Sequence, residues 1–467
     1  MLVERWSETV VVTGLGAVSP FGRGIKSFIA GLRSGDSGVR LLSKDRQAER
    51  VCVGATSSES PLPEGLTTAD SARLPKLSPM ALAAGREAMD MSGLAFVPSQ
   101  TSRQGPAQGD PAANNGNDDN SELRRSRRIG LVLGTGGGGI DFTLAQAKHW
   151  HEGKRPSLWT ITNATHGNLA GELSIGLGLR GPSQCVSTGC ASSSDAVGRA
   201  LEMLRLSSVL AERSGEDAEG VLDAVVVVGA DAHVGPETLL TMDLLGVLSR
   251  RACRTDAEAA AACRPFDARR DGFVLGEGAW AMVLERAASA GARRASPVGS
   301  VLGYAATCDA YHRVRPEPSM AEGARAMRLA VADAGLSPTD IEAILYHGTG
   351  TAVNDASETV AVKLAFGDHA ESLRGSSIKG AIGHPQGACG AASCVAVLGS
   401  LGALDRVPGD REGFWPPTIN LTEPDDACDL NYTPNESVPS RARRVLVNCL
   451  AFGAKNSALV LEVSGGA

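Results

Sequence analysis

Short apolar runs alternate with long stretches of helix-forming residues along the whole chain, and this alternation most restricts the possible fold. The runs predicted as strands are nearly continuous in apolar residues, which is typical of strands that are covered on both faces. They span residues 10–13, 129–134, 224–229, 341–345 and 444–448. The stretches predicted as helices span residues 78–91, 191–210, 321–334 and 385–404. The order strand, helix, strand, helix predicts an α/β architecture with helices on both sides of the sheets.

One polar segment, residues 99–126, interrupts this alternation. It is rich in Gly, Pro and Asn. Such a segment cannot bury enough apolar surface to offset the entropy lost on ordering, so a flexible insertion on the surface is expected. Residues 211–220 and 251–263 are interpreted as smaller insertions.

Strand, turn and helix recur in the same order in the two halves of the chain. The first half has a predicted strand, a turn at 187–190 and a helix, and the second half has a strand, a turn at 383–385 and an Ala-rich helix. The recurrence suggests an internal duplication.

Charge and composition argue against several classes of function. The 467 residues are 43% hydrophobic and carry a formal net charge of −7, which argues against general nucleic-acid binding. No run of about 18 apolar residues is present, so no membrane span is expected. The N-terminus lacks the basic, apolar and small-residue sections of a secretory signal, so a cytoplasmic protein with reduced thiols is expected.

Ten cysteines are scattered along the chain and none forms a CxxC pair, so no metal site is expected. Cys190 stands in the segment SQCVSTGCASSSDAVGRALEML, where a β-prone run meets a Gly turn and small residues open a long helix. Its thiol is therefore predicted at a helix N-terminus, where partial positive charge favours the thiolate. Cys190 is a candidate nucleophile, although most buried cysteines only fill the core.

Two histidines lie beside Gly-rich turns. His347 stands in ILYHGTGT, where an apolar strand ends, and the sites of α/β sheets gather at strand ends. His384 stands in KGAIGHPQGACG, and because Pro385 suits a first helical position, His384 is predicted to face the positive end of a helix. That setting predicts an uncharged imidazole. Lys379 precedes His384 by five residues, in a predicted loop.

A thiol with two histidines and a lysine fits several kinds of enzyme. Residue types alone do not separate a thiol transferase, a hydrolase and a condensing enzyme. A capping or buried structural role is the plain alternative for each histidine, and a solvated side chain is the alternative for the lysine.

Several longer motifs occur in a fixed order. They are VVVTGLGAVSPFG at 10–22, STGCASSSDAVG at 187–198, RPFDARRDGFVLGEGA at 264–279, HGTGT at 347–351, KGAIGH at 379–384, PPTINL at 416–421 and LAFGAKNSALVL at 450–461. In these motifs the chain resembles the β-ketoacyl-acyl-carrier-protein synthases, and the similarity runs from residue 10 to residue 463 apart from the insertions.

The resemblance implies a thiolase fold, in which two similar halves form a five-layer αβαβα sandwich. The expected halves are residues 1–295, with the nucleophile, and 296–467, with the two histidines and the lysine. A homodimer is implied, with a heterodimer as the alternative. In the implied reaction, an acyl chain moves from an acyl carrier protein to Cys190 and then condenses with the enolate of a decarboxylated malonyl carrier. The phosphopantetheine arm of the carrier belongs to the substrates, and no separate cofactor, nucleic acid or membrane is implied.

The resemblance also assigns roles to residues. Cys190 would hold the acyl group, and the backbone N–H groups of Cys190 and Phe452 would form the oxyanion hole. His347 and His384 would donate hydrogen bonds to the malonyl thioester oxygen. The other implied residues support this chemistry: Lys379 paired with Glu358, Asp355 as a further carboxylate, Thr349 and Thr351 on the pantetheine arm, and Phe452 as a gate.

The chain departs from the family pattern in places. AFGAK at 451–455 replaces the common Gly-Phe-Gly-Gly-Thr, and the presence of Lys455 leaves the behaviour of the gate loop open. PQ at 385–386 replaces Thr-Leu, and Cys389 replaces a small residue. With the STGC turn, these changes favour a specialised synthase for polyketides, polyenes or unusual fatty acids over primary fatty acid synthesis.

Two other functions fit the same superfamily. A chain-length-setting partner subunit lacks the nucleophilic cysteine, whereas Cys190 is present here. A non-decarboxylating acyltransferase of the thiolase kind pairs a second cysteine with a histidine, whereas this chain has His347 and His384. A condensing enzyme is therefore favoured.

Two further signals are weak. GTGGGG at 134–139 lacks the GK[ST] ending of a phosphate loop, so close backbone packing beside a substrate tunnel is predicted instead. Basic residues could dock an acidic carrier protein, although a solvated surface is favoured for the larger group. They are the cluster Arg124, Arg125, Arg127 and Arg128 and the pair Arg73 and Lys76.

Overall fold

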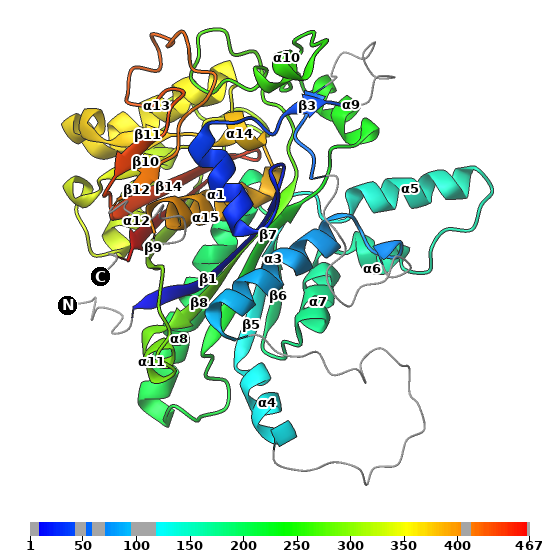
Figure 1. Cartoon of the computed structure of the whole chain (residues 1–467), viewed down its shortest axis with the longest axis vertical. Helices are drawn as coiled ribbons and strands as arrows, with labels where there is room; N and C mark the ends of the chain where they lie inside the picture. Colours follow the sequence, from blue (N-terminus) through cyan, green and yellow to red (C-terminus); the bar gives the residue numbers. More distant parts are fainter. Residues whose placement is uncertain (1–8, 43–52, 58–70, 95–117, 403–411, 465–467) are drawn as a thin grey trace.

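The structure, a computed structural model, describes residues 9–42, 53–57, 71–94, 118–402 and 412–464 (Figure 1). The main strands lie in one sheet in the order β11-β10-β14-β15-β9-β1-β8-β7-β5-β6. Its first-half strands are β1 (Val10–Ser19), β5 (Ile129–Gly134), β6 (Ser183–Val186), β7 (Ala224–Asp231) and β8 (Gly278–Arg286). Its second-half strands are β9 (Gly299–Cys308), β10 (Ala343–Leu345), β11 (Arg374–Ser376), β14 (Arg444–Ala451) and β15 (Lys455–Val463).

The two groups of five strands repeat the same pairing. In the first half, β1–β8 and β8–β7 are antiparallel, and β7–β5 and β5–β6 are parallel. In the second half, β9–β15 and β15–β14 are antiparallel, and β14–β10 and β10–β11 are parallel. The pairing of β1 with β9 joins the halves. The same order of strands in both halves agrees with the suggested duplication, while the division at residue 295 stays a prediction.

Helices cover both faces of each half-sheet. The largest core cluster joins α8 (Ser192–Ser214) and α15 (Cys389–Leu401) to strands of both halves, so these two helices form the central layer. Helices α3 (Leu77–Ser92) and α7 (His166–Leu177) pack on the outer face of the first half. Helices α12 (Ala321–Asp333) and α13 (Ala352–Phe366) pack on the outer face of the second half. These are the five αβαβα layers expected of the thiolase fold (Figure 1).

The remaining elements are short or peripheral. The helices are α1 (Ile25–Ser34), α4 (Asp118–Arg127), α5 (Ile140–His151), α6 (Thr160–Ala164), α9 (Pro236–Leu244), α10 (Asp256–Ala260), α11 (Ala287–Ala292) and α14 (Lys379–Ile382). The 3-10 turns are η3 (Gly189–Ala191), η4 (Pro338–Asp340), η5 (Gly367–Ser372) and η6 (Gln386–Ala388). The short strands are β2 (Gly22–Arg23), β3 (Arg40–Leu41), β4 (Val53–Gly54), β12 (Gly413–Trp415) and β13 (Val438–Ser440).

All five predicted strands and all four predicted helices are present, with shifted ends. The helix predicted at 385–404 opens as η6 and continues as α15 to Leu401. The insertion predicted at 99–126 differs at its end, because α4 occupies residues 118–127; residues 99–117 lie outside the described residues. The smaller insertion at 251–263 contains α10.

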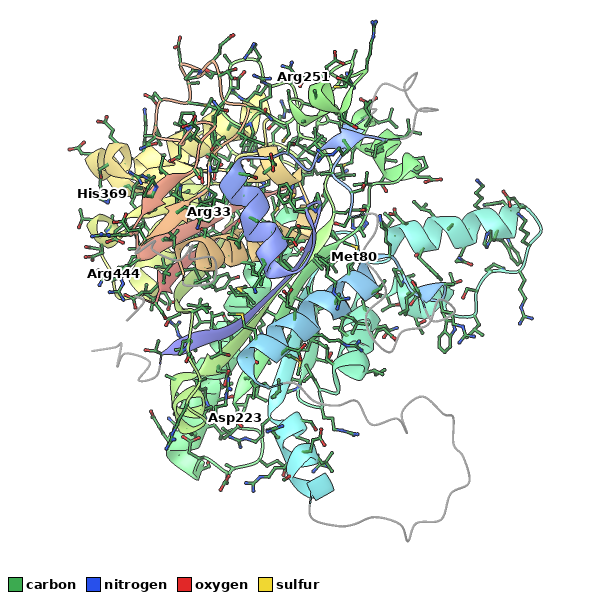
Figure 2. All side chains as sticks on the ribbon, in the orientation of Figure 1. Arg33, Met80, Asp223, Arg251, His369 and Arg444 are labelled. Carbon is green, nitrogen blue, oxygen red and sulfur yellow. The ribbon has the colours of Figure 1, made fainter. Side chains whose placement is uncertain are left out.

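An ion-pair cluster closes one end of the first half-sheet. Asp223, labelled in Figure 2, accepts hydrogen bonds from Arg128 at 2.6 and 2.7 Å. Arg286, the last residue of β8, donates to the carbonyl oxygen of Leu222 at 2.8 Å. Because Arg128 directly precedes β5 and Asp223 directly precedes β7, these contacts align the ends of three strands.

Among the described helices, none combines the length and the apolar composition that crossing a bilayer requires.

Candidate active site

Cys190 lies where the sequence places it, between a strand and the N-terminus of a long helix. Strand β6 ends at Val186, Gly189 turns the chain with a left-handed φ of 68°, and Cys190 precedes α8 within η3. A Cβ on Gly189 would lie 3.4 Å from the carbonyl oxygen of Phe452, so the turn passes close to the loop after β14. Cys190 is buried and lines a cavity of about 330 Å³.

His347 follows β10 and is held through its backbone and its ring. Its N–H donates to the carboxylate of Glu358 at 2.7 Å, and its carbonyl oxygen accepts a hydrogen bond from Nζ of Lys379. The same Nζ lies 3.5 Å from Nδ1 of the imidazole. Burial and the positive charge of Lys379 lower the pKa of His347 well below its ordinary value. Since an ammonium only donates, Nδ1 accepts from it and Nε2 keeps the proton.

His384 is fixed by the first half of the chain. Its N–H donates to the carbonyl oxygen of Val274 at 2.7 Å, and its own carbonyl oxygen accepts from the N–H of Gly276 at 3.0 Å. The ring of Phe273 stands edge-on to the imidazole, with the centroids 4.9 Å apart. The segment 273–276 therefore positions a histidine of the second half near Cys190 of the first.

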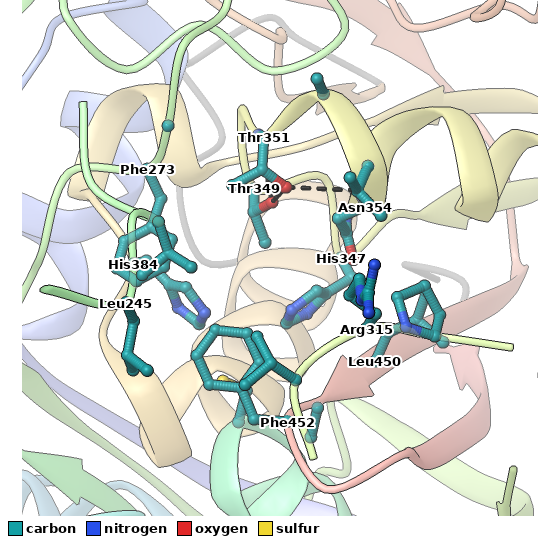
Figure 3. A pocket seen from close by; sticks show the side chains of 18 of the residues that line it. Leu245, Phe273, Arg315, His347, Thr349, Thr351, Asn354, His384, Leu450 and Phe452 are labelled. Carbon is teal, nitrogen blue, oxygen red and sulfur yellow. Dashed lines mark hydrogen bonds between the residues drawn. The ribbon is translucent and has the colours of Figure 1, made fainter. Parts of the chain in front are cut away.

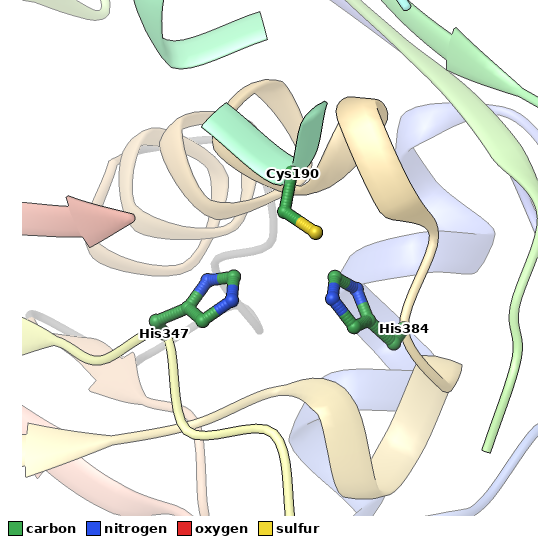
Figure 4. A group of neighbouring side chains, drawn as sticks. All are labelled: Cys190, His347 and His384. Atoms are coloured by element: carbon green, nitrogen blue, oxygen red, sulfur yellow. The ribbon is translucent and has the colours of Figure 1, made fainter. Parts of the chain in front are cut away.

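The three predicted side chains converge. One ligand atom each of Cys190, His347 and His384 lies within 4.8 Å of the other two, and the two imidazole centroids are 5.3 Å apart (Figure 4). A buried thiol with two imidazoles suits nucleophilic catalysis, and residues of these types also bind transition metals. The geometry alone leaves both uses open.

The two imidazoles differ in charge: His347 is uncharged, whereas the uncharged imidazole predicted for His384 is wrong. Burial favours the neutral ring of His384, but the neighbouring thiol groups of Cys190 and Cys389 raise its pKa to about 9. Nδ1 of His384 lies 3.5 Å from Sγ of Cys389. The two neighbouring sulfurs therefore favour the protonated form of the His384 imidazole.

The expected surroundings of Lys379 also need correction. Lys379 opens the one-turn helix α14 and is buried, whereas a loop was predicted. In the described part of the chain, Lys379 forms no ion pair with Glu358. The carboxylate oxygens of Glu358 instead accept hydrogen bonds from the N–H groups of His347 and Gly348 and from Nδ2 of Asn448. Burial raises the pKa of Glu358 to about 7. Lys379 acts on His347 directly.

The threonines and the second carboxylate lie in the turn after His347. Thr349 and Thr351 line the cavity, and their hydroxyl oxygens are 3.0 Å apart. Asp355 is fully buried and accepts from the N–H groups of Thr349 and Gly350 at 2.9 and 3.1 Å. Asp355 thus holds the turn that presents the two hydroxyl groups to the cavity.

Phe452 lies beside the two imidazoles in the hairpin loop between β14 and β15 (Figure 3). In this loop Gly453 donates to the carbonyl oxygen of Arg313 at 2.8 Å, and Ala454 takes a left-handed φ of 59°. Lys455 pairs with Ala451 as the first residue of β15. The lysine leaves the hairpin pairing intact, whereas Ala454 occupies a conformation that favours glycine.

One positioning residue escaped the sequence reasoning. Asp231 ends β7 and is fully buried. Its carboxylate accepts hydrogen bonds from the N–H groups of Gly136 and Gly387 at 2.8 and 2.6 Å and from the hydroxyl of Thr135 at 2.6 Å. Nε2 of His233 lies 2.7 Å from Oδ1 of the same carboxylate. Asp231 thus ties the Gly-rich loop to the turn after His384. Its position at the end of a buried strand was a signal that could have found it.

The Gly-rich segment 134–139 packs closely against α8, as predicted, but its residues are not among those that line the cavity. A Cβ on Gly134 would come within 2.4 Å of the Cα of Ser193 in α8. Two of the basic docking candidates are neutralised, since Arg128 bonds Asp223 and Lys76 bonds Glu277. Arg124 pairs with Asp217 at 2.6 Å at an exposed position.

Comparisons with known proteins agree with this geometry. The family described as "Beta-ketoacyl synthase, N-terminal domain" matches residues 7–290, and "Beta-ketoacyl synthase, C-terminal domain" matches residues 298–422. A protein of Synechocystis sp. named 3-oxoacyl-[acyl-carrier-protein] synthase 2 is 32% identical over 458 residues, which cover 97% of each chain.

Solved structures of condensing enzymes superpose over nearly the whole chain. One is the AntDE:AntF complex, described as a type II polyketide synthase acyl-carrier protein with its ketosynthase bound to the hexaketide. Its TM-score is 0.79 and its sequence identity is 26%. The match covers 98% of this chain and 100% of that chain. Another is the ishigamide ketosynthase/chain length factor, with a TM-score of 0.78, 28% identity and the same coverage.

Proposed function

Because the chain belongs to the β-ketoacyl synthase family and is a condensing acyltransferase, we propose that Cys190, His347 and His384 are its catalytic residues. The observation that carries the proposal is the convergence of these three side chains on one buried cavity. The assignment favours nucleophilic catalysis over metal binding at this cluster. Under this assignment, the first half of the chain supplies Cys190 and the second half supplies the two histidines.

Acyl transfer begins at Cys190. The Cys190 thiolate attacks the thioester carbon of the acyl carrier, a new C–S bond forms, and the bond to the pantetheine sulfur breaks. The protonated ring of His384 lies within reach to give Nε2–H to the departing pantetheine thiolate. The backbone N–H groups of Cys190 and Phe452 stabilise the oxyanion, because both segments meet at Gly189.

Condensation then needs an enolate. The malonyl group loses carbon dioxide, its C–C bonding electrons form the enolate, and Nε2–H of His347 donates to the developing oxyanion. The enolate carbon attacks the acyl thioester and expels the Cys190 thiolate. One proton is consumed in each cycle, and a proton taken up by His384 restores the initial state. His384 in that protonated state supplies a second hydrogen bond to the enolate oxygen.

The mouth of the cavity suits a phosphopantetheine arm. Thr349 and Thr351 offer hydroxyl groups to the amides of the arm, and Asn354 lines the same wall (Figure 3). Arg315 is exposed at the mouth and matches a phosphate charge. An acyl carrier protein is therefore the partner that we propose for the delivery of both substrates. Its phosphopantetheine arm is then part of each substrate, and we propose no separate cofactor.

The pathway we favour is specialised, with polyketide or polyene chains as products and primary fatty acids as the alternative. Ala454 and Lys455 change the loop that carries Phe452, and Cys389 adds a thiol beside His384. These residues border the reacting groups, so they affect which acyl chains are processed. Of the two similar structures described above, one is a type II polyketide synthase complex and the other is a ketosynthase/chain length factor.

Mass spectrometry with a panel of acyl carriers tests this function. We expect the acyl group that is accepted best to add its mass to the peptide that contains Cys190. Malonyl carrier should then release one carbon dioxide for each elongated chain. Elongation without carbon dioxide release, or a loaded acyl group on another residue, would contradict the proposed function and favour a non-decarboxylating acyltransferase.

We propose further that a second copy of the chain covers the apolar surface around α5, α6 and α7. Of the sixteen large apolar side chains that are exposed among the described residues, seven lie between residues 140 and 175. They are Ile140, Leu144, Trp150, Leu158, Trp159, Ile161 and Ile175. Among the described strands, β6 ends the sheet with one edge unpaired, and it packs against α7. A symmetric partner would cover both surfaces.

Sedimentation velocity tests the dimer. Ile161 is 76% exposed, and Ile161→Asp would place a charge in the proposed interface, so we expect the sedimenting mass to fall by half. Leu364 on α13 is 50% exposed on the opposite outer layer, and Leu364→Asp should leave the mass unchanged. A wild-type chain that sediments as a monomer at micromolar concentration would contradict the proposed dimer.

A further inference from the structure

Cys389 is a second buried thiol at the active site, and the mechanism above gives it no role. It is the first residue of α15 and is 2% exposed. Its Sγ lies 3.5 Å from Nδ1 of His384, on the side of the ring that is turned away from the cavity. It is also 2.8 Å from the carbonyl oxygen of Gln386 and 3.5 Å from that of Cys190.

The neighbours of Cys389 decide the direction of the hydrogen bond. Both carbonyl oxygens only accept, so the S–H hydrogen points to the nearer one, that of Gln386. Gln386 takes a left-handed φ of 49°, which places this carbonyl oxygen against the sulfur. The sulfur lone pairs then face Nδ1 of His384, and Nδ1–H donates to them. A thiolate at Cys389 would accept from Nδ1–H in the same way.

We propose that Cys389 is a positioning residue that keeps a proton on Nδ1 of His384, so that Nε2 is the nitrogen that exchanges a proton with Cys190. Lys379 imposes the opposite arrangement on His347, whose Nδ1 accepts and whose Nε2 keeps its proton. The two imidazoles therefore differ in function. His347 is a fixed donor, and His384 exchanges a proton with the nucleophile.

The proton step balances within this cluster. The proton on Sγ of Cys190 moves to the lone pair of Nε2, which leaves a thiolate and an imidazolium that carries both N–H groups. Sγ of Cys389 accepts from Nδ1–H throughout, which stabilises the imidazolium. The raised pKa of His384 agrees with this arrangement, since Cys190 and Cys389 both raise it against the effect of burial.

The other groups near His384 also affect the positive charge of its protonated ring. His347 is uncharged, and the Lys379 ammonium is bonded to the backbone oxygen of His347. Cys449 on β14 adjoins Cys389. Burial raises the pKa of Cys389, but Cys449, Lys379 and His384 together lower it well below its ordinary value.

Alkylation of Cys190 by iodoacetamide tests the inference without turnover, although the inference itself rests on the proposed roles of Cys190 and His384. The rate is followed by mass spectrometry of the Cys190 peptide between pH 5 and pH 10, with the exposed Cys308 as an internal reference. In Cys389→Ala, Nδ1–H loses its acceptor. We expect the pH–rate profile to move up by about one unit and the rate at pH 7 to fall about tenfold.

Two further variants separate this effect from a loss of packing. A serine hydroxyl can also donate to the Gln386 carbonyl and accept from Nδ1–H, so Cys389→Ser should retain the wild-type profile within about 0.3 units. Cys394→Ala removes another fully buried thiol of α15, and should leave the profile unchanged.

A Cys389→Ala profile that coincides with wild type would overturn the inference, as would an equal displacement in Cys394→Ala. Failure of the proposed function gives a different result, because the wild-type Cys190 would then react no faster than Cys308.

Discussion

Replacement of Cys190 by alanine should abolish chain elongation, with a loss of at least about 10⁴-fold, while the protein remains folded. No other described thiol lies in the cavity between the imidazoles, so no neighbour can take over the acyl group. The substitution removes one sulfur that borders a cavity, so the free energy of unfolding should change by no more than about 1 kcal/mol. Product formation by mass spectrometry and urea unfolding measure the two effects.

Cys185 offers the matched control. It lies in β6, five residues before Cys190, and burial raises its pKa to about 12, so its thiol is inert at neutral pH. Cys185→Ala should elongate chains at nearly the wild-type rate. Elongation that survives in Cys190→Ala would move the nucleophile to another residue.

The position of Cys190 could be predicted because it depends on local sequence. An apolar strand, a glycine and small residues before a long helix specify a turn that leaves Cys190 at the helix N-terminus. His347 could be placed at a strand end for the same reason. The sequence also suggested a repeated strand–turn–helix unit, although residues 183–186 and 374–376 were not among the predicted strands. In the structure, β6 with α8 and β11 with α15 take corresponding places in the two halves.

The charges in the site could not be predicted, because they depend on contacts that secondary structure does not show. Sequence suggested that His384 faces only the positive end of a helix, and hence is neutral. In the structure η6 winds the chain so that Cys389 meets the ring, and Cys190 and Cys389 raise the pKa of His384 against the effect of burial. Similarly, the pairing of Lys379 with Glu358 failed because nearby N–H groups already occupy the carboxylate.

His347→Ala should slow carbon dioxide release from malonyl carrier about 10²- to 10³-fold, and should slow acylation of Cys190 much less. The difference arises because Lys379 fixes His347 as a neutral donor whose Nε2–H points into the cavity, where the enolate oxygen forms. His384 still contacts Cys190 in this variant, so the thiolate still forms. Since the lowered pKa of His347 lies well below 6.5, this contribution should not change between pH 7 and pH 9.

His347→Asn is the informative companion, because its amide N–H can donate near the position of the lost imidazole. We expect it to recover part of the decarboxylation rate, whereas acylation should match that of His347→Ala. Radiolabelled carbon dioxide release and acyl-enzyme formation, measured on the same preparations, separate the two steps. If His347→Ala lost both steps equally, the donor on the enolate oxygen would have to be sought elsewhere, and His384 would be the remaining imidazole in reach.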